Sequence, residues 1–209
     1  MHTDRVPSPT QHGVQGNLLI EIPGYEIREK LSENAPFLIY RGQRHEDLAP
    51  VLLKVLNRSF PTPKYLAPLW QEFEILRLLD FPGVEKAYSL ENHQQWWMIV
   101  LADGGGLPTD QLEIAGRMQP GEFLHIALQL AQIVEGIHGC QVIHKNISPA
   151  NISFNPSTGH VTLTNFRYAS LVSRERVPLQ SPYKLAEYLA YTSPELTGRM
   201  NRSVDYRTD

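Results

Sequence analysis

The sequence predicts an α+β fold in two parts, a strand-rich N-terminal half followed by a mostly helical C-terminal half. Short apolar runs separated by Pro- and Gly-containing turns fill residues 22–101, which is typical of β-strands. Within residues 123–138, apolar side chains recur at three- and four-residue spacing, which indicates an amphipathic helix. A hydrophobic content of 42% with 20% charged residues is that of a folded globular chain.

The first half is expected to contain five strands and one helix. The strands are expected at residues 25–31, 37–42, 50–56, 84–90 and 96–101. Pro61 and Pro63 interrupt the chain before a helix expected at 65–79, and Pro82 with Gly83 marks the turn after it. The last two strands then form a hairpin.

The second half is expected to be organised around one helix. Three glycines at 104–106 mark the crossing into it, and Pro120 begins a helix that continues through 138. We interpret its apolar stripe as core packing; the stripe consists of Phe123, Ile126, Ala127, Leu130, Ile133, Val134 and Ile137. A short hairpin at 152–163 follows. Cys140 is the single cysteine, which excludes an internal disulfide, and we expect it to be a small buried residue.

Charge and hydropathy exclude several classes of function. A net charge of −3 gives no reason to expect a nucleic-acid partner or polybasic membrane attachment. No apolar run reaches the length that spans a bilayer, and the N-terminus lacks the order of a secretory signal. We therefore expect a cytoplasmic protein without membrane insertion, in which residues 1–21 form a disordered tail.

The most informative segment is HKNISPAN at residues 144–151, which resembles the catalytic loop H-R-D-L-x-x-x-N of protein kinases. Asn146 stands at the position of the catalytic Asp, and a neutral amide cannot accept a proton as a carboxylate does. Three further segments follow the order of kinase motifs. They are VLLK at 51–54 for V-A-I-K, NFR at 165–167 for D-F-G, and SPE at 193–195 for A-P-E.

The run SPELTGRMNR at 193–202 resembles, more specifically, the Ser/Thr-kinase-like domain at the N-terminus of cyanobacterial-type multidomain hybrid sensor histidine kinases. This resemblance implies a two-lobed protein-kinase-like fold. Its small lobe, with about five antiparallel strands and one helix, would span 22–101, with a hinge at 102–106. Residues 107–209 would form a mostly helical large lobe that is incomplete, because the sequence ends where the family's central helix begins.

The resemblance also implies roles for individual side chains. Lys54 would contact nucleotide phosphates, paired with Glu72 or, as the alternative, with Glu74. Leu101 would line the nucleotide site. His144 would be structural and bond the backbone near the NFR turn.

The two metal positions of the family are both occupied by amides. Asn151 and Asn165 each could offer an oxygen to Mg²⁺, but neither carries the charge that this hard ion prefers. Both are therefore weak metal candidates.

The phosphate-binding loop departs furthest from the family. Residues 32–37 read SENAPF and contain no glycine, whereas kinases use a Gly-rich loop here. Pro36 removes a backbone donor, Phe37 adds bulk, and Glu33 adds negative charge. We interpret the segment as an ordinary hairpin turn. Arg167 replaces the Gly of D-F-G, and we interpret it as a surface side chain.

These departures predict a pseudokinase, a catalytically impaired domain that acts as a binding or regulatory module in signalling with a protein partner or attached signalling domains. ATP and Mg²⁺ are possible by family resemblance, and their binding is expected to be weak or absent. One alternative is a weakly active ATP-dependent Ser/Thr protein kinase that uses Lys54 and Asn151. A second is a truncated gene product without function.

Overall fold

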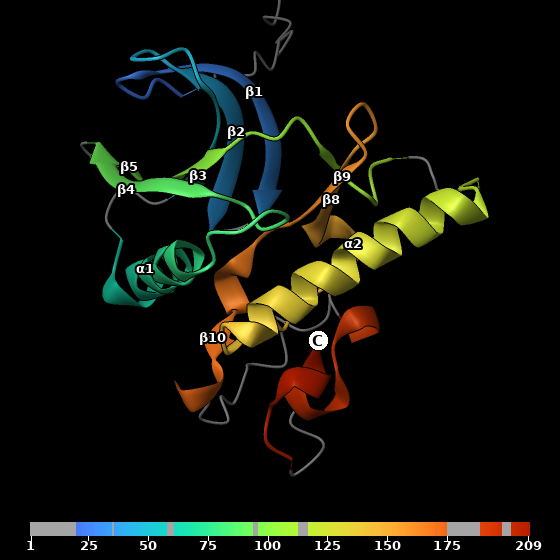
Figure 1. Ribbon diagram of the computed structural model, residues 1–209. Helices are drawn as coiled ribbons and strands as arrows, with labels where there is room; N and C mark the ends of the chain where they lie inside the picture. Colours follow the sequence, from blue (N-terminus) through green and yellow to red (C-terminus); the bar gives the residue numbers. More distant parts are fainter. Residues whose placement is uncertain are drawn as a thin grey trace, which may run out of the picture.

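Figure 1 shows the computed structural model, which describes residues 20–34, 36–57, 61–93, 96–112, 117–174, 189–197 and 202–209. Most of the expected N-terminal tail, residues 1–19, lies outside these ranges, as do residues 198–201 of the run at 193–202. The described chain forms a curved sheet flanked by one helix and joined to a second lobe that is built around a longer helix (Figure 1).

The sheet of the first lobe has five antiparallel strands in the spatial order β1-β2-β3-β5-β4. They are β1 (Tyr25–Asn34), β2 (Phe37–Arg44), β3 (Pro50–Leu56), β4 (Ala87–His93) and β5 (Trp96–Ala102). Helix α1 (Pro63–Leu78) follows β3 and packs against β4 and β5. The predicted arrangement of five antiparallel strands with one helix is confirmed.

Strand β3 is apolar on both faces because the sheet is covered on both sides. Val51, Leu53 and Val55 are fully buried in a core on one face. Leu56 is buried on the other face in a second core that includes residues of α1. Lys54 shares this second face with Leu56, since side chains alternate along a strand. The alternation therefore directs the ammonium group toward α1 and the second lobe.

The second lobe is built around α2 (Pro120–Gly139), which runs diagonally below the sheet in Figure 1. Its strands form two small ladders: β6 (Leu107–Pro108), β8 (Ile152–Asn155) and β9 (His160–Leu163) in one, and β7 (Val142–Ile143) with β10 (Ser170–Leu171) in the other. Short 3₁₀ turns complete the described residues: η1 (Pro149–Asn151), η2 (Phe166–Tyr168), η3 (Val172–Arg174), η4 (Leu189–Tyr191), η5 (Pro194–Thr197) and η6 (Tyr206–Thr208).

One apolar core runs through both lobes. Leu69 of α1 shares it with Ile137 of α2 and Phe166 of η2. The loop after α1 adds a close contact, because the ring of Phe81 lies directly against Gly136 of α2. A Cβ built on Gly136 would stand 2.7 Å from this ring. The missing side chain at position 136 is therefore what allows the loop to pack so near the helix.

Besides shifts of one to three residues at the ends of several elements, the fold differs from the sequence-based expectations in the following details. The strand expected from residue 84 begins at Ala87, because Val84 instead forms a bridge with Leu163 of β9. Phe123, expected in the core, has 59% of its surface exposed. Cys140 is exposed rather than buried.

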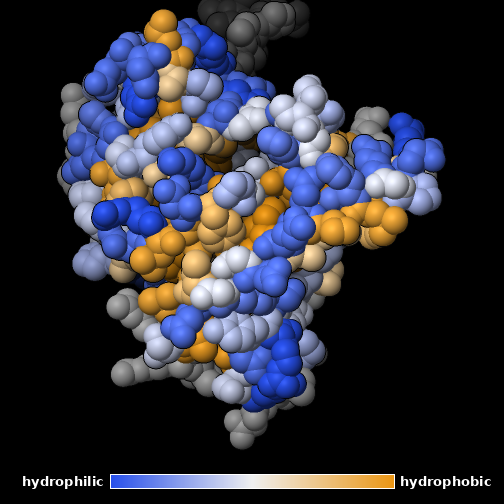
Figure 2. All heavy atoms as spheres, in the orientation of Figure 1, coloured by the Kyte–Doolittle hydropathy of each residue, from blue (hydrophilic) through white to orange (hydrophobic). Residues whose placement is uncertain are grey.

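Apolar side chains gather on the surface at the N-terminal end of α2 (Figure 2). Phe123, Leu124 and Leu128 are the exposed members of this group, whereas Ile126 and Ile133 of the same helix are buried. Helix α2 thus carries apolar side chains both toward the core and toward the surface. Among the residues described, none of the helices has both the length and the apolar character needed to cross a membrane.

Candidate active site

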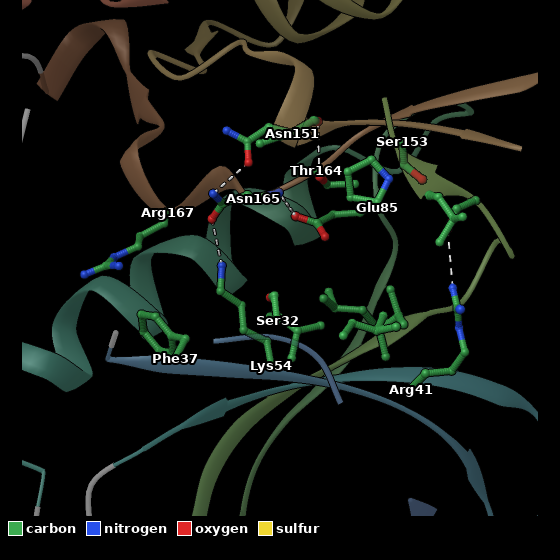
Figure 3. Close-up of a pocket in the computed structure, with 18 of the residues that line it drawn as sticks. Ser32, Phe37, Arg41, Lys54, Glu85, Asn151, Ser153, Thr164, Asn165 and Arg167 are labelled. Carbon is green, nitrogen blue, oxygen red and sulfur yellow. Dashed lines mark hydrogen bonds between the residues drawn. The ribbon is translucent and has the colours of Figure 1, made fainter. Parts of the chain in front are cut away.

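A cavity of about 170 Å³ lies between the sheet and the second lobe (Figure 3). Leu31, Ile39 and Leu52 line it from β1, β2 and β3. Leu101 lines it from β5, and Leu107 lines it from β6. Leu101, which the sequence placed in a cofactor site, thus lies in the wall of this cavity.

Lys54 reaches the cavity from β3 and is held by a carboxylate of α1. Its Nζ lies 2.6 Å from Oε1 of Glu72, and the two side chains are only 6% and 1% exposed. A buried charge needs such a partner, because an isolated one is very costly away from water. Glu74 is not the partner; its side chain is 60% exposed and lies near Arg77.

Lys54 also begins a line of hydrogen bonds that reaches three asparagines, of which Figure 3 shows Asn165 and Asn151. Its Nζ donates to Oδ1 of Asn165 at 3.0 Å, and Nδ2 of Asn165 donates to Oδ1 of Asn151 at 3.0 Å. Nδ2 of Asn151 donates in turn to the backbone oxygen of Asn146 at 2.8 Å. We call these four residues the amide chain. An ammonium group can only donate, so Lys54 fixes the orientation of the Asn165 amide and, through it, that of the Asn151 amide.

The amide chain does not fit a Mg²⁺ ion. The side-chain oxygens of Asn151 and Asn165 already accept hydrogen bonds. The Lys54 ammonium stands 3.0 Å from one of these oxygens, where it would repel a metal cation. Mg²⁺ normally takes carboxylate and phosphate oxygens, and nowhere in the described part of the chain do three His, Cys, Asp or Glu side chains lie close enough to share a metal ion.

His144 lies in the loop that precedes η1 and is enclosed by its neighbours. Its ring is completely buried and packs edge-on against Phe166. Nε2 lies 3.1 Å from the backbone oxygen of Thr164, and Nδ1 accepts the backbone N–H of Asn146. Burial lowers the pKa of His144 to about 4, although the Asp209 carboxylate acts in the opposite direction. The neutral ring can therefore donate through one nitrogen and accept through the other.

The same loop is fixed from below by one carboxylate. The side chain of Asp209 accepts the backbone N–H groups of His144 at 2.8 Å and Lys145 at 2.6 Å. Lys145 has a left-handed backbone with φ of 66°, a conformation that persists where the surroundings hold it. Nδ2 of Asn146 is buried and has no partner within the described ranges. An amide at this position can donate or accept a hydrogen bond, but it has no basicity with which to remove a proton from a hydroxyl group.

The turn that resembles D-F-G differs from the expectation at its last residue. Arg167 does not point away to the surface; it lines the cavity, with its Cζ 4.9 Å from the centre of the Phe37 ring. The left-handed backbone of this turn falls on Asn165, with φ of 64°. Asn tolerates this conformation better than most residues, so Arg167 needs no unusual backbone.

In the β1–β2 hairpin, the bulky ring of Phe37 and the negative charge of Glu33 lie on different sides. Phe37 is 3% exposed and lines the cavity. Glu33 lies on the outside, where its carboxylate pairs with Lys30 at 2.6 Å. The hairpin therefore brings an aromatic ring into the cavity and keeps its negative charge in solvent.

Sequence reasoning missed an ion pair at one end of the cavity. Nε of Arg41 in β2 lies 2.6 Å from Oδ2 of Asp103. Nη2 of Arg41 also donates to the backbone oxygen of Gly106 at 3.3 Å, and Figure 3 shows this second contact. Asp103 and Gly106 belong to the segment that links the lobes, so Arg41 ties the sheet to this linker. In the sequence, the only indication of this ion pair was the position of Asp103 directly before three glycines.

Glu85 is a second residue that sequence reasoning missed. Its carboxyl lines the cavity and accepts the backbone N–H of Asn165. Burial raises the pKa of Glu85 to about 7, and the nearby Lys54 acts in the opposite direction. No pattern signalled this position, because strand alternation alone does not say which residues face a cavity between lobes.

Comparisons with known proteins agree with this geometry. Residues 25–209 match the protein kinase domain family. Myosin light chain kinase A of Dictyostelium discoideum is 21% identical over 184 residues, which are 87% of this chain and 62% of that protein. Serine/threonine-protein kinase TIO of Arabidopsis thaliana is 27% identical over 197 residues, which are 88% of this chain and 14% of that protein. Serine/threonine-protein kinase 36 of Pongo abelii is 26% identical over 196 residues, again 88% of this chain and 14% of that protein.

The chain spans 62% of the length of the first of these relatives and 14% of the other two. The likeness to them therefore concerns the kinase-like region, in which protein kinases use ATP with Mg²⁺. In the structure, the segments at 51–54, 144–151 and 165–167 meet around one cavity between a five-stranded sheet and a second lobe. With the family match over residues 25–209, this arrangement shows that the chain belongs to the protein kinase domain family.

Proposed function

We propose that this chain is a pseudokinase, a protein-kinase-like domain that has lost phosphotransfer and serves as a binding or regulatory module in signalling. The amide chain is the observation that carries this proposal. Neutral side chains stand at Asn146 and Asn165, where the family has carboxylates, and within the amide chain the side-chain oxygens of Asn151 and Asn165 already accept hydrogen bonds.

The size of the expected loss supports this reading. A positioned general base contributes about 10²–10⁴ in rate, and Asn146 cannot supply it. Phosphoryl transfer in kinases also depends on metal ions that neutralise the developing charge. Lys54 still carries its charge, held by Glu72 and Asn165, but an ammonium group is not a general base and does not replace Asn146 in that role.

Transfer of radiolabelled phosphate from MgATP to a generic protein substrate tests the proposal. The matched control is the double variant Lys54→Met/Glu72→Leu, which removes the cation without leaving an unpaired buried charge. We expect the unmodified protein to give the same label as this control. We also expect Asn146→Asp with Asn165→Asp to gain little, because Phe37 still lies in the cavity. Label clearly above the control would sink the proposal.

A weakly active Ser/Thr protein kinase is the second candidate. The observation in its favour is the Lys54–Glu72 ion pair, which is formed at 2.6 Å. In that case the unmodified protein would transfer phosphate slowly, and the double variant would abolish the transfer.

We further propose that the domain works in the cytoplasm, with a protein partner or attached domains, in a protein of the hybrid sensor histidine kinase type. The run at 193–202 supports this proposal, and five of its residues lie in η5 and just before it. Sequencing of the native gene beyond the codon of Asp209 tests the attached domains, and a stop codon directly after it would contradict them. Cell fractionation tests the location, and recovery of the protein in the membrane or secreted fraction would contradict it.

A further inference from the structure

Strand β2 contacts the second lobe through its first residue. Phe37 begins β2, and the Arg167 side chain reaches it from the 3₁₀ turn η2, with its Cζ 4.9 Å from the centre of the Phe37 ring. This is the distance of a cation–π contact. The guanidinium also lies 5.4 Å from the ring centre of its neighbour Tyr168. Two aromatic rings thus hold the charged end of Arg167 at the tip of the β1–β2 hairpin.

The backbone that carries Arg167 is fixed by its neighbours. The ring of Phe166 is completely buried in the core that both lobes share, where it packs edge-on against His144. Nε2 of Gln71 in α1 donates to the backbone oxygen of Ala169 at 2.8 Å, directly after the turn. Because the turn is anchored on both sides, a side chain that extends from it can restrain the hairpin that it meets.

The same face of β2 is held a second time, by Arg41, and Figure 3 shows Phe37 and Arg41 at opposite ends of the cavity. Side chains alternate along a strand, so Arg41 shares the face of Phe37 and lies about 13 Å from it along β2. Its Nε is bound to Asp103 of the linker at 2.6 Å. One contact would leave the sheet free to pivot about it. Two contacts at this separation oppose the hinge motion by which the lobes could part.

We propose that β2 acts as a clamp, in which the Phe37–Arg167 contact and the Arg41–Asp103 ion pair keep the two lobes closed without any ligand. An enzyme that encloses its substrate must open again to release the product. A binding module instead gains affinity from a surface that is already arranged before its partner arrives. The inference rests on the proposed function and deepens it: the relative position of the lobes, and with it the surface that a partner meets, does not depend on nucleotide.

Pulsed electron spin resonance on the full chain tests the clamp by measuring the distance between the lobes. Cys140 is the only cysteine of the sequence and is exposed directly after α2, so it can carry one spin label. A cysteine introduced by Glu46→Cys, in the exposed turn after β2, carries the other. We expect one narrow distribution of distances in this labelled parent, and we expect ATP with Mg²⁺ to leave it unchanged.

Two single substitutions in the labelled parent break the contact at the hairpin. Arg167→Gln removes the cation, and Phe37→Leu removes the ring while keeping an apolar side chain. The ring also lies 5.3 Å from Nζ of Lys54, but that contact stays within the first lobe. In each variant we expect the population at longer distances to rise about fivefold, the effect of one cation–π contact. Adding Arg41→Gln/Asp103→Asn to Arg167→Gln should give the largest open population.

Arg77→Gln is the matched control, because Arg77 lies over the Phe73 ring, with its Cζ 5.8 Å from the ring centre, and both residues belong to α1. This variant loses a cation–π contact within one helix, so we expect the distribution of the labelled parent.

Three outcomes would overturn the inference. One is a broad distribution in the labelled parent, and another is a parent that closes only when ATP and Mg²⁺ are added. The third is a folded Arg167→Gln or Phe37→Leu with the same distribution as the control. If one of these two variants does not fold, the other decides; if neither folds, the parent with and without MgATP decides. Freely opening lobes would remove the clamp and leave the proposed function standing, whereas radiolabel transfer above its control would remove the proposed function itself.

Discussion

At the scale of single residues, Glu85 is a side chain whose ionisation depends strongly on the fold. Its carboxyl lies beside Asn165 and shares its surroundings with Lys54 and Glu72. Burial and the charge of Glu72 raise its pKa to about 7, while Lys54 and the backbone N–H groups of Asn165 and Phe166 lower it. In the unfolded chain the same carboxyl has its ordinary pKa of 4.5.

This difference fixes the direction of a pH effect. Between these two values the folded state holds a proton that the unfolded state has lost, so stability falls as pH rises from 4.5 to about 7. We predict that Glu85→Gln flattens this part of the profile and makes the protein more stable than the unmodified chain above the window. Each pKa unit corresponds to about 1.4 kcal/mol, and we expect a gain of about 1–3 kcal/mol.

Urea unfolding at about pH 5 and about pH 8 brackets the window and measures this gain. Glu33→Gln is the control, since its carboxylate is exposed and paired with Lys30. The pKa of His144 is lowered to about 4, so its contribution to the stability of the protein is lost as pH falls below 6.5. This effect has the opposite sign to that of Glu85. It is the same in the variant and in the unmodified protein, so it cancels in their comparison. Parallel profiles for Glu85→Gln and the unmodified chain would contradict the prediction.

At the scale of elements, the contact between the loop after α1 and helix α2 depends on a missing side chain. In a helix, Gly→Ala normally stabilises by up to about 1 kcal/mol. At Gly136 the added Cβ would meet the Phe81 ring at 2.7 Å, and such overpacking costs about 1–3 kcal/mol. We therefore predict that Gly136→Ala lowers the free energy of unfolding, against the usual helix preference.

Gly139 gives a matched control on the same helix, because a Cβ there would meet no atom within 4 Å. Gly139→Ala should leave stability unchanged or raise it by up to about 1 kcal/mol. Denaturant unfolding of the two variants decides the matter. Equal stabilisation by both would show that Phe81 moves aside at no cost.

The elements themselves could largely be read from the sequence. Prolines and glycines in the sequence indicated the approximate ends of the strands and of α1. The spacing of the isoleucines in α2 indicated which side of this helix is buried. The two-residue strands β6, β7 and β10 were not predicted, because two residues carry no period. The burial of Phe123 was predicted wrongly for a related reason. Helical spacing indicates which side of a helix is apolar, but it does not indicate how much of that side a neighbouring element covers.

The cavity was only partly predictable. The order of the motifs indicated Lys54, Asn151 and Asn165 as neighbours, and the structure brings these three together. The entry of Phe37 and Glu85 into the same space was not foreseen. Their placement depends on how a hairpin and a loop from one lobe meet the other, and no local pattern encodes that meeting.

At the scale of the whole molecule, three polar connections among the described residues add to the apolar core that the lobes share. The linker after β5 is tied to the sheet by Arg41 and Asp103. The loop before β4 pairs with β9, through the N–H of Leu163 on Gly83 and the N–H of Glu85 on Leu163. The third connection is the ion pair and amide chain that begin at Lys54 in the sheet. This third connection lies in the interior, so damage to it should affect the molecule as a whole.

We predict that Lys54→Met lowers the free energy of unfolding by about 3–5 kcal/mol, because Glu72 then remains charged and unpaired in the core. The double variant Lys54→Met/Glu72→Leu should recover most of this loss. The control cycle uses the exposed pair Lys30 and Glu33, where each change should cost less than about 1 kcal/mol. Urea unfolding of both single variants and the double variant of each pair measures the two cycles, and a Lys54→Met/Glu72→Leu variant no more stable than Lys54→Met would refute the prediction.

The orientation that Lys54 imposes on the amides also bears on how this chain can evolve. An aspartate at 165 would still accept from Lys54, but its second oxygen would face Oδ1 of Asn151, at the place where a donor now stands at 3.0 Å. An aspartate at 146 would add a further negative charge without the metal to neutralise it. Single reversions toward the acidic residues of the family therefore meet an energetic barrier before any catalytic gain. If phosphotransfer has been lost as proposed, its return therefore requires several simultaneous substitutions, because the donors of the amide chain are already in use.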